Sequence, residues 1–333
     1  MDYDEGIGWH DATIRPYGPI EMNPATVVLH YAQETFEGLK AYRRADGQIQ
    51  LFRPEMNARR MINSNERLCM ATIPEDMFIE AVNALVKAEE DWVPSEPETS
   101  LYIRPFAFAC ESSLGVHKSK AYKFVIILSP VGAYYAEGLA PVKIMVEDEY
   151  VRAVQGGTGF TKCGGNYAGS IIGQVKAEKY GCSQVLWLDG RERKYVEEVG
   201  AMNIMFKIDG EIYTAPIEGT VLPGVTRDSI IHILKDWGYK VNETHLSVDD
   251  LMHKIVNIIS IVCQITYLGI NTVSCRCNTV ILSNEYCSFK RLSIYLKQFI
   301  SYIRRKIIAF HICIFSYKQK FIICLFLSKH SSK

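Results

Sequence analysis

The sequence predicts a mixed α/β protein with two domains, followed by a C-terminal segment of a different kind. Of the 333 residues, 48% are hydrophobic and 22% are charged, which is ordinary for a globular protein with a large core. Short strand-like runs and helical periods alternate up to about residue 254. All twelve prolines, all four tryptophans and 22 of the 23 glycines lie in that part. The chain therefore divides into a body, residues 1–254, and a tail, residues 255–333.

The body and the tail carry opposite net charges. The body has 26 Lys and Arg residues against 36 acids, whereas the tail has eleven against one acid, Glu285. Nucleic-acid-binding proteins concentrate basic residues on one face. The acidic body and the formal neutrality of the whole chain therefore argue against that class.

The cysteines and the N-terminus predict a cytoplasmic protein. The four cysteines of the body form no C-x-x-C pair and are too sparse for a disulfide scaffold, which favours a reducing compartment. Residues 1–16 have no apolar stretch typical of a secretory signal, and their acids argue against a transit peptide. The two apolar runs near the C-terminus are interrupted by Lys318, Gln319 and Lys320, so no membrane-spanning helix is predicted.

The first predicted domain, residues 1–134, combines strands and two helices. Extended runs at 29–43 and 48–53 are joined by Ala45-Asp46-Gly47, a hairpin signal. Pro54 suits the first turn of a helix through Leu68, and a second amphipathic helix is expected from Pro74 to Asp91. Further strands are expected at 100–109 and 123–129.

The second predicted domain begins at about residue 143, after an interdomain connection at 135–142 that is rich in Gly, Pro and aromatic residues. A strand is expected at 143–153, and a helix from Tyr167 to Tyr180 that Gly181 can end. Short strands are then expected at 183–189, 194–200, 203–208 and 211–216.

Two further helices are expected at the end of the body. Thr226 is expected to cap the first of them, and Gly238 to end it. Ser247 and Asp250 form a capping box that opens the second.

The loop GGTGFTKCGGN, residues 156–166, is the segment most indicative of chemistry. A phosphate-binding P-loop needs Gly directly before its lysine and Ser or Thr directly after, but Thr161 and Cys163 occupy those places. A dinucleotide-binding G-x-G-x-x-G would need Gly at the position of Lys162. Glycines on both sides let a ligand approach Lys162, as a Schiff-base lysine requires. A solvated loop lysine is the alternative interpretation.

Two other features suit a ligand with a pyridinium nitrogen and a phosphate. Glu198 provides a carboxylate that can keep a pyridinium nitrogen protonated, although a buried glutamate is also common in ion pairs. The segment Gly224-Val225-Thr226 opens a helix, whose first backbone N–H groups suit a phosphate, although they are also satisfied by an ordinary cap.

Seven segments of the body resemble the branched-chain amino acid aminotransferases, which are pyridoxal-phosphate enzymes of fold type IV. The resemblance runs from Trp9 to about Met252. The segments are LHYAQETFEGLKAYR, LFRPEMNARRM, SLYIRP, SPVGAYY, TKCGGNYAGS, EEVGAMN and LPGVTRDS. The resemblance implies a two-domain fold type IV structure with pyridoxal 5'-phosphate as cofactor.

The resemblance also implies a cofactor site. Lys162 corresponds to the Schiff-base lysine that moves the substrate proton, and Tyr167 to the tyrosine at the phenolic oxygen of the cofactor. Glu198 corresponds to the carboxylate at the pyridine nitrogen, with Glu197 as the rival. The remaining matches are the phosphate ligands, which are Arg60, with Arg59 one register away, Val225 and Thr226.

A substrate site is implied in the same way. Its aromatic lining corresponds to Tyr31, Phe36, Tyr102 and Tyr134. Arg104 corresponds to a group for the distal carboxylate of 2-oxoglutarate, Lys40 is a second basic residue, and Ala201 lies near the substrate α-carboxylate. Phe36 and Tyr134 could instead belong to the core. Tyr102 and Arg104 are expected on one face of a strand, where arginine is a poor core residue.

The reaction implied by the resemblance is transamination of leucine, isoleucine or valine with 2-oxoglutarate, by a homodimer. Alternatives are an inactive truncated product, or another fold type IV enzyme such as a D-amino acid aminotransferase or aminodeoxychorismate lyase. No metal is expected, because Cys275-x-Cys277 is too short for a common zinc spacing.

The tail does not match the family. Residues 255–333 contain one glycine, Gly269, and therefore no Gly-Thr-Gly turn of the kind that closes over the phosphate in the family. The composition predicts that the tail derives from a frameshift, an intron read-through or a misjoined gene. A basic extension at a membrane surface and a genuine C-terminal domain are the less favoured alternatives.

Overall fold

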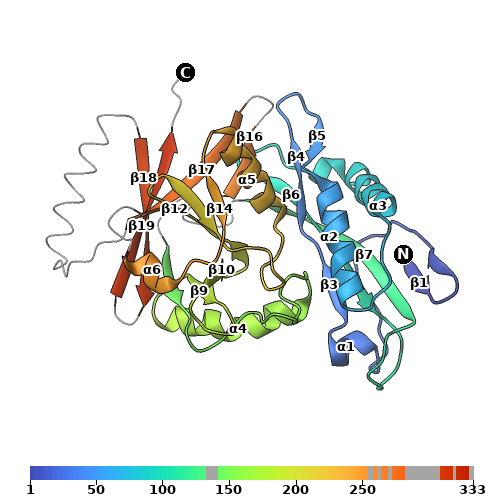
Figure 1. Cartoon of the computed structure of the whole chain (residues 1–333). Coiled ribbons are helices and arrows are strands. Elements are labelled where there is room, and N and C mark those ends of the chain that lie inside the picture. Colours follow the sequence, from blue (N-terminus) through green and yellow to red (C-terminus); the bar gives the residue numbers. More distant parts are fainter. Residues whose placement is uncertain are drawn as a thin grey trace. The chain divides into compact units, whose positions relative to one another are not determined.

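The computed structural model describes residues 1–132, 142–253, 258–261, 264–268, 272–281, 308–317 and 320–329. The chain folds into two units (Figure 1). Unit 1 comprises Met1–Tyr134, Thr158–Ala168 and Tyr267–Thr272, and unit 2 comprises Tyr135–Gly157, Gly169–Thr266 and Val273–Lys333. Apart from Val142, the predicted connection at 135–142 lies outside the described residues, and the predicted domain boundaries stay a prediction.

Unit 1 is built on a seven-stranded antiparallel sheet. Its strand order is β2 (Gly8–His10), β1 (Asp2–Asp4), β7 (Ala121–Val131), β6 (Ser100–Ala109), β4 (Leu39–Arg43) and β5 (Ile49–Leu51), with β3 (Glu34–Phe36) also paired to β6. Its helices are α1 (Val27–Tyr31), α2 (Pro54–Arg67), α3 (Glu75–Ala88) and the 3₁₀ turn η1 (Glu90–Trp92).

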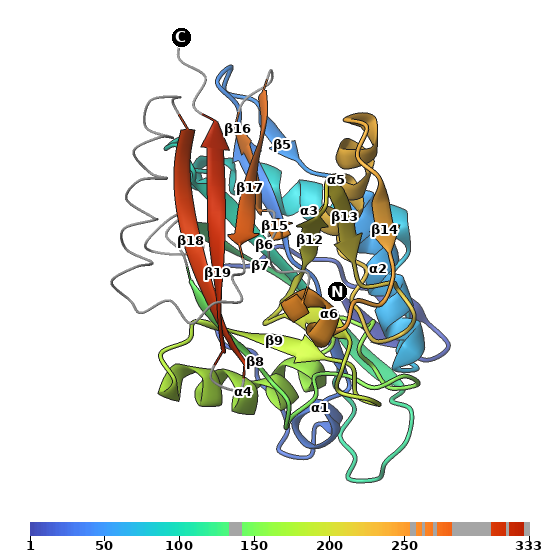
Figure 2. The ribbon, with the colours of Figure 1, turned by 60° about the vertical axis from the view of Figure 1, so that its left-hand side comes forward.

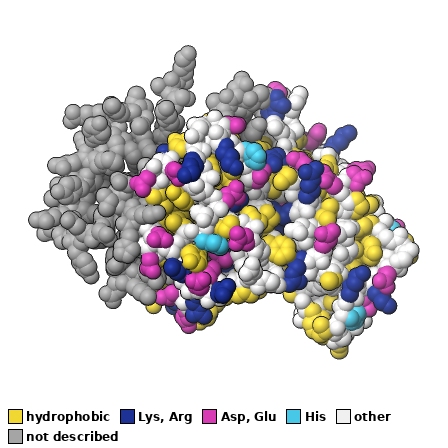
Figure 3. All heavy atoms as spheres, in the orientation of Figure 1, with side chains coloured by type: hydrophobic (Ala, Val, Ile, Leu, Met, Phe, Trp, Pro, Cys, Tyr) yellow, Lys and Arg dark blue, Asp and Glu magenta, His cyan; other side chains and the backbone are white. Residues whose placement is uncertain are grey.

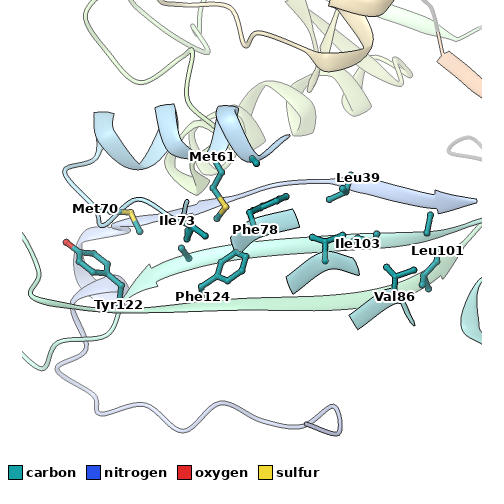
Figure 4. Close-up of a cluster of buried hydrophobic side chains, with 14 of the residues drawn as sticks. Leu39, Met61, Met70, Ile73, Phe78, Val86, Leu101, Ile103, Tyr122 and Phe124 are labelled. Atoms are coloured by element: carbon teal, nitrogen blue, oxygen red, sulfur yellow. The ribbon is translucent and has the colours of Figure 1, made fainter. Parts of the chain in front are cut away.

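The core of unit 1 lies between the sheet and the two long helices. In α3, Phe78, Val82 and Val86 recur every four residues and therefore share one buried face. In β6, Leu101 and Ile103 alternate with partly exposed residues, as expected of a strand with one face on the core. Figure 4 shows Phe78 and Val86 of the helix beside Leu101 and Ile103 of the sheet.

Most predicted elements of unit 1 are confirmed, with one local error. The helix expected from Pro54 ends at Arg67, and the strand expected at 100–109 has those bounds. The extended run expected from residue 29 is wrong at its start, because Val27–Tyr31 is helical. Val27 is buried and anchors this short helix, which ends where Ala32 turns to a φ of 50°.

The described part of unit 2 contains two sheets and three helices. The eight-stranded sheet has the order β11 (Met202–Asn203), β10 (Val196–Val199), β9 (Gln184–Leu188), β8 (Lys143–Val146), β18 (Ile308–Tyr317), β19 (Lys320–Lys329), β17 (Thr272–Ile281) and β16 (Gln264–Leu268). The four-stranded sheet has the order β14 (Val241–Glu243), β13 (Glu211–Thr214), β12 (Met205–Ile208) and β15 (Ile258–Ile261). The helices are α4 (Gly164–Lys179), α5 (Val225–Asp236) and α6 (Val248–His253), of which α4 starts in unit 1.

Strands of the tail extend both sheets. Strand β18 pairs in parallel with β8 and antiparallel with β19, so these strands lie side by side in Figure 2. Strand β15 pairs with β12 of the body. Strand pairing in the tail was not predicted from its sequence, and the predicted origin of the tail remains a prediction.

The helix signals of unit 2 are largely confirmed. Gly181 and Gly238 adopt φ values of +65° and +79° just after α4 and α5. The capping box is present, because Asp250 donates its backbone N–H to Ser247 Oγ over 2.9 Å. The cap assigned to Thr226 is wrong by two residues, since extended Gly224 holds the N-cap position. The strand expected at 143–153 ends at Val146.

Two glycines of α4 provide a matched test of packing in unit 2. A Cβ on Gly173 would overlap the indole of Trp187, which is 1% exposed, whereas a Cβ on Gly169 would meet nothing within 4 Å. We expect Gly169→Ala to raise the free energy of unfolding by about 1 kcal/mol through helix propensity. Gly173→Ala should lower it by about 1–2 kcal/mol, because overpacking exceeds that gain. Urea unfolding of both variants measures the difference, and equal effects would contradict the packing argument.

The surface of the described part is mixed in charge. Lys and Arg side chains are interspersed with Asp and Glu on the face shown in Figure 3. No helix among the described residues is long and apolar enough to cross a membrane. Over the same residues, no group of three His, Cys, Asp or Glu side chains is placed to hold a metal ion.

Candidate active site

The lysine singled out from the glycine-rich loop lies beside a tyrosine within unit 1. Lys162 Nζ is 2.6 Å from the hydroxyl oxygen of Tyr167. Tyr167 lies in the first turn of α4, and the helix begins at Gly164, two residues after the lysine. A lysine two residues before the helix and a tyrosine in its first turn therefore place an amine and a phenol side by side.

The ring of Phe36, on β3, contacts both Lys162 and Tyr167. Lys162 Nζ lies 4.5 Å from its ring centroid, and the Tyr167 ring lies 4.8 Å away at 55°. The guanidinium carbon of Arg104 lies 4.6 Å from the same centroid. Two cations thus contact the electron-rich face of one aromatic ring. Phe36 therefore contacts the candidate site directly, whereas a core phenylalanine would contact apolar neighbours.

Arg104 and Tyr102 share one face of β6, as expected from their spacing. Arg104 donates to the Tyr102 hydroxyl from Nη2 over 2.7 Å and from Nε over 3.1 Å. The Tyr102 hydroxyl also occupies the place where Gly38 would carry a Cβ, so glycine is needed there. Lys40, on β4, pairs in register with Tyr102. Burial lowers the pKa of the Lys40 ammonium below its usual range.

Arg60 forms a buried ion pair on α2. Its Nε and Nη2 donate to the two carboxylate oxygens of Glu37 over 2.7 and 2.8 Å, and Asn57 donates a third hydrogen bond over 2.8 Å. The side chain of Arg60 is 9% exposed, and that of Glu37 is fully buried. Arg59 instead points outward, is 61% exposed and pairs with Glu75. Burial therefore distinguishes the two neighbouring arginines.

Glu198 is a buried carboxylate of unit 2 with several polar partners. It accepts hydrogen bonds from the backbone N–H of Leu222 over 2.9 Å and from Asn203 Nδ2 over 3.0 Å. Arg152 Nε lies 3.1 Å from its other oxygen. Glu198 is 3% exposed. Two hydrogen bonds and one ion pair thus surround this buried carboxylate.

Glu197, the rival residue, has a different environment. The register of β10 against β9 shifts between Val196 and Glu198, and this irregularity buries Glu197 as well. Burial raises the pKa of the Glu197 carboxyl above its usual range. A raised pKa makes Glu197 a poor permanent anion.

The first turn of α5 supplies backbone donors. Gly224 is the N-cap, and Val225 and Thr226 are the first two helical residues. No side chain caps this end of the helix. A Cβ on Gly224 would overlap the side-chain oxygen of Asn203, so glycine is required. A helix N-terminus of this kind suits a phosphate group.

The remaining predicted substrate residues lie as follows. Tyr31 ends α1, is 40% exposed and donates its hydroxyl hydrogen bond to the carbonyl of Leu114. Ala201 is exposed in the turn between β10 and β11. Tyr134 lies outside the described residues.

Sequence reasoning missed the groups that hold the predicted residues in place. Glu37 lies within the FEG segment but carried no signal that it would bind Arg60. Arg152 and Asn203 meet Glu198 only through the fold of unit 2. A buried arginine is expected to have an acidic partner, but the spacing of residues in the sequence does not show which acid this is.

These arrangements coincide with a known family. The family model described as amino-transferase class IV matches residues 34–259, which span every described site residue except Tyr31. The chain belongs to this family.

Curated members of the class IV aminotransferases are similar over most of the body. Branched-chain-amino-acid transaminase 1 of Bacillus subtilis (strain 168) is 54% identical over 252 residues, which are 75% of this chain and 71% of that protein. A probable branched-chain-amino-acid aminotransferase of Staphylococcus aureus (strain N315) is 55% identical over 251 residues, covering 75% and 70%.

Solved structures of class IV aminotransferases share the fold. The branched-chain amino acid aminotransferase of Escherichia coli matches with a TM-score of 0.63 and 26% identity, over 72% of this chain and 77% of that one. A second branched-chain amino acid aminotransferase, solved with pyridoxamine 5'-phosphate, matches with a TM-score of 0.60 and 28% identity, over 72% and 76%. The predicted mixed α/β architecture of fold type IV is thereby confirmed.

Proposed function

We propose that this class IV aminotransferase transfers the amino group of leucine, isoleucine or valine to 2-oxoglutarate, with pyridoxal 5'-phosphate as cofactor. The 54–55% identity to enzymes named for branched-chain amino acids supports this substrate class over D-amino acids or aminodeoxychorismate. The observation that carries the proposal is the Lys162–Tyr167 pair, with an amine 2.6 Å from a phenol.

The residues present fit pyridoxal phosphate in the chemistry of their donors and acceptors. In unit 1, the amine of Lys162, the phenol of Tyr167 and the guanidinium of Arg60 suit an aldehyde, a phenolic oxygen and a phosphate. In unit 2, the buried carboxylate of Glu198 suits a pyridine nitrogen, and the first turn of α5 suits a phosphate. When bound, the cofactor supplies the electron sink for carbanion chemistry.

Each residue has a distinct proposed role. Lys162 Nζ is the base that takes the proton from the substrate Cα and returns it, and Tyr167 orients that amine. Glu198 accepts a hydrogen bond at the pyridine nitrogen and keeps it protonated, with Arg152 stabilising the carboxylate charge. Arg60, Val225 and Thr226 bind the phosphate.

The substrate is proposed to lie against Phe36, Tyr102, Tyr31 and Tyr134, which offer an apolar surface to a branched side chain. Arg104 binds the distal carboxylate of 2-oxoglutarate by a charge-assisted hydrogen bond. Ala201 lies near the α-carboxylate. A second copy of the chain, forming a homodimer, completes the proposal.

The test is the visible absorption of the purified full chain with added pyridoxal phosphate. We expect a band of the protein-bound cofactor that decreases on addition of leucine but persists with D-alanine. A band that decreases with D-alanine and not leucine would contradict the substrate class. Soluble protein without any band would contradict cofactor binding and favour the inactive alternative.

A further inference from the structure

We propose that Glu34 is a positioning residue that fixes the backbone of the Lys162 loop and thereby aims the lysine amine. Glu34 lies on β3, and its carboxylate accepts a hydrogen bond from the backbone N–H of Gly164. Gly164 follows Lys162 by two residues and is the first residue of α4. The inference concerns the same lysine as the proposed function and rests on its assignment.

Strand β3 and helix α2 form three hydrogen bonds with the backbone of Lys162 and Gly164. Ser64 Oγ accepts from the backbone N–H of Lys162 over 3.0 Å. The carbonyl of Lys162 accepts from the backbone N–H of Phe36 over 2.9 Å. Glu34 then takes the N–H of Gly164. Of these three contacts, the last is made by a charged side chain. It reaches from strand β3 to the N-terminus of helix α4.

Strand β3, which carries Glu34, is held in place by its own contacts. Glu34 pairs with Phe108 in the antiparallel register of β3 on β6. The neighbouring Thr35 donates to the side-chain oxygen of Asn65, on the same helix as Ser64, and both are fully buried. The backbone of Glu34 therefore cannot shift unless the paired strand β3 also moves. For this reason the carboxylate holds the loop at a fixed position relative to the sheet.

Charge and shape both favour this contact. A carboxylate at a helix N-terminus is stabilised by the helix dipole and by the first N–H groups, which lack partners within the helix. Burial raises the pKa of the Glu34 carboxyl, while the Gly164 N–H and the charge of Arg104 oppose that rise. A Cβ on Gly164 would overlap Glu34 Oε1, so the glycine makes room for the carboxylate.

Glu34 thus links two parts of the candidate site within unit 1. Its charge interacts with Arg104, which contacts the same Phe36 ring as the lysine amine. Loss of the carboxylate should free the start of α4 and let Lys162 Nζ move relative to Tyr167 Oη. A change in the lysine position alters the bound cofactor's spectrum and not only the turnover.

Three variants of the full chain test this role. Glu34→Ala removes the acceptor, Glu34→Gln keeps an amide oxygen for Gly164, and Glu66→Ala removes an exposed glutamate of α2 as control. The first readout is hydrogen exchange at Gly164 in protein free of cofactor. We expect Glu34→Ala to exchange about tenfold faster than the parent chain, and the other two variants within about twofold of it.

The second readout is the pH midpoint of the cofactor band, measured with pyridoxal phosphate added. Glu34→Ala should shift it by about one pH unit, and Glu34→Gln should restore most of the parent value. Unchanged exchange and midpoint in Glu34→Ala, or equal changes in both Glu34 variants, would overturn the proposal. If the parent chain gives no band, the proposed function fails by itself, and the exchange of Gly164 still decides whether Glu34 anchors the loop.

Discussion

Replacement of Lys162 by alanine should lower the transamination rate by at least about 10³-fold. The substitution removes the amine that links to the cofactor and the base that moves the substrate proton, and acid–base catalysis alone contributes about 10²–10⁴-fold. Tyr167, 2.6 Å from that amine, cannot replace it, because a phenol forms no Schiff base with an aldehyde. Single-turnover and steady-state assays with leucine and 2-oxoglutarate measure the loss.

The matched control is Lys118→Ala, which removes an exposed lysine elsewhere in unit 1. We expect Lys118→Ala to retain the parent rate. Lys162→Ala should bind pyridoxal phosphate without the visible band of a lysine-bound cofactor, and its circular dichroism should match that of the control. A Lys162→Ala chain with more than about a tenth of the parent rate would remove this lysine from the proposed role.

Local patterns were sufficient to predict the elements that carry the site. The four-residue spacing of Phe78, Val82 and Val86 follows from one buried helix face, so α3 could be predicted within a few residues. Tyr102 and Arg104 lie on one side of β6 because side chains alternate along a strand. The loop around Lys162 could be identified because its glycines allow a ligand to approach the backbone more closely than bulkier residues would.

The partners of the site residues could not be predicted, because they depend on tertiary packing. Glu37 and Arg60 come from a strand connection and a helix, and nothing in their spacing specifies the pair. Arg152 and Glu198 are joined only when strands β9 and β10 place the carboxylate. The short helix α1 was missed for a related reason, since a five-residue helix leaves too little periodicity to distinguish it from a strand.

The tail shows the limit of reasoning from composition. Its bias toward Ile, Lys, Cys and Phe distinguishes it from the body, and the family match ends at residue 259. Its apolar, β-branched runs are nevertheless strand-forming, and β18 pairs with β8 of the body. Composition indicates where a segment differs, but pairing is decided by the free edge of the sheet that the segment meets.

Replacement of Glu37 by alanine should lower the free energy of unfolding of the chain by about 3–5 kcal/mol. The carboxylate takes two hydrogen bonds from Arg60 and one from Asn57, and it is fully buried. Removal of one member of a buried pair leaves a charge in a poorly solvated place, which costs far more than the pair contributes. Urea unfolding followed by circular dichroism measures the change.

An exposed pair between helices α2 and α3, Arg59 with Glu75, distinguishes burial from charge pairing. Arg59 and Glu75 are also hydrogen-bonded, at 2.8 Å, but the Arg59 side chain is 61% exposed. Glu75→Ala should therefore change the free energy of unfolding much less than Glu37→Ala, since solvent screens an exposed pair. Equal losses of unfolding free energy in the two variants would show that the burial of Glu37 adds nothing to its charge pairing. A larger loss for Glu37→Ala, together with weaker binding of pyridoxal phosphate, would show that the same carboxylate stabilises unit 1 and orients the proposed phosphate ligand Arg60.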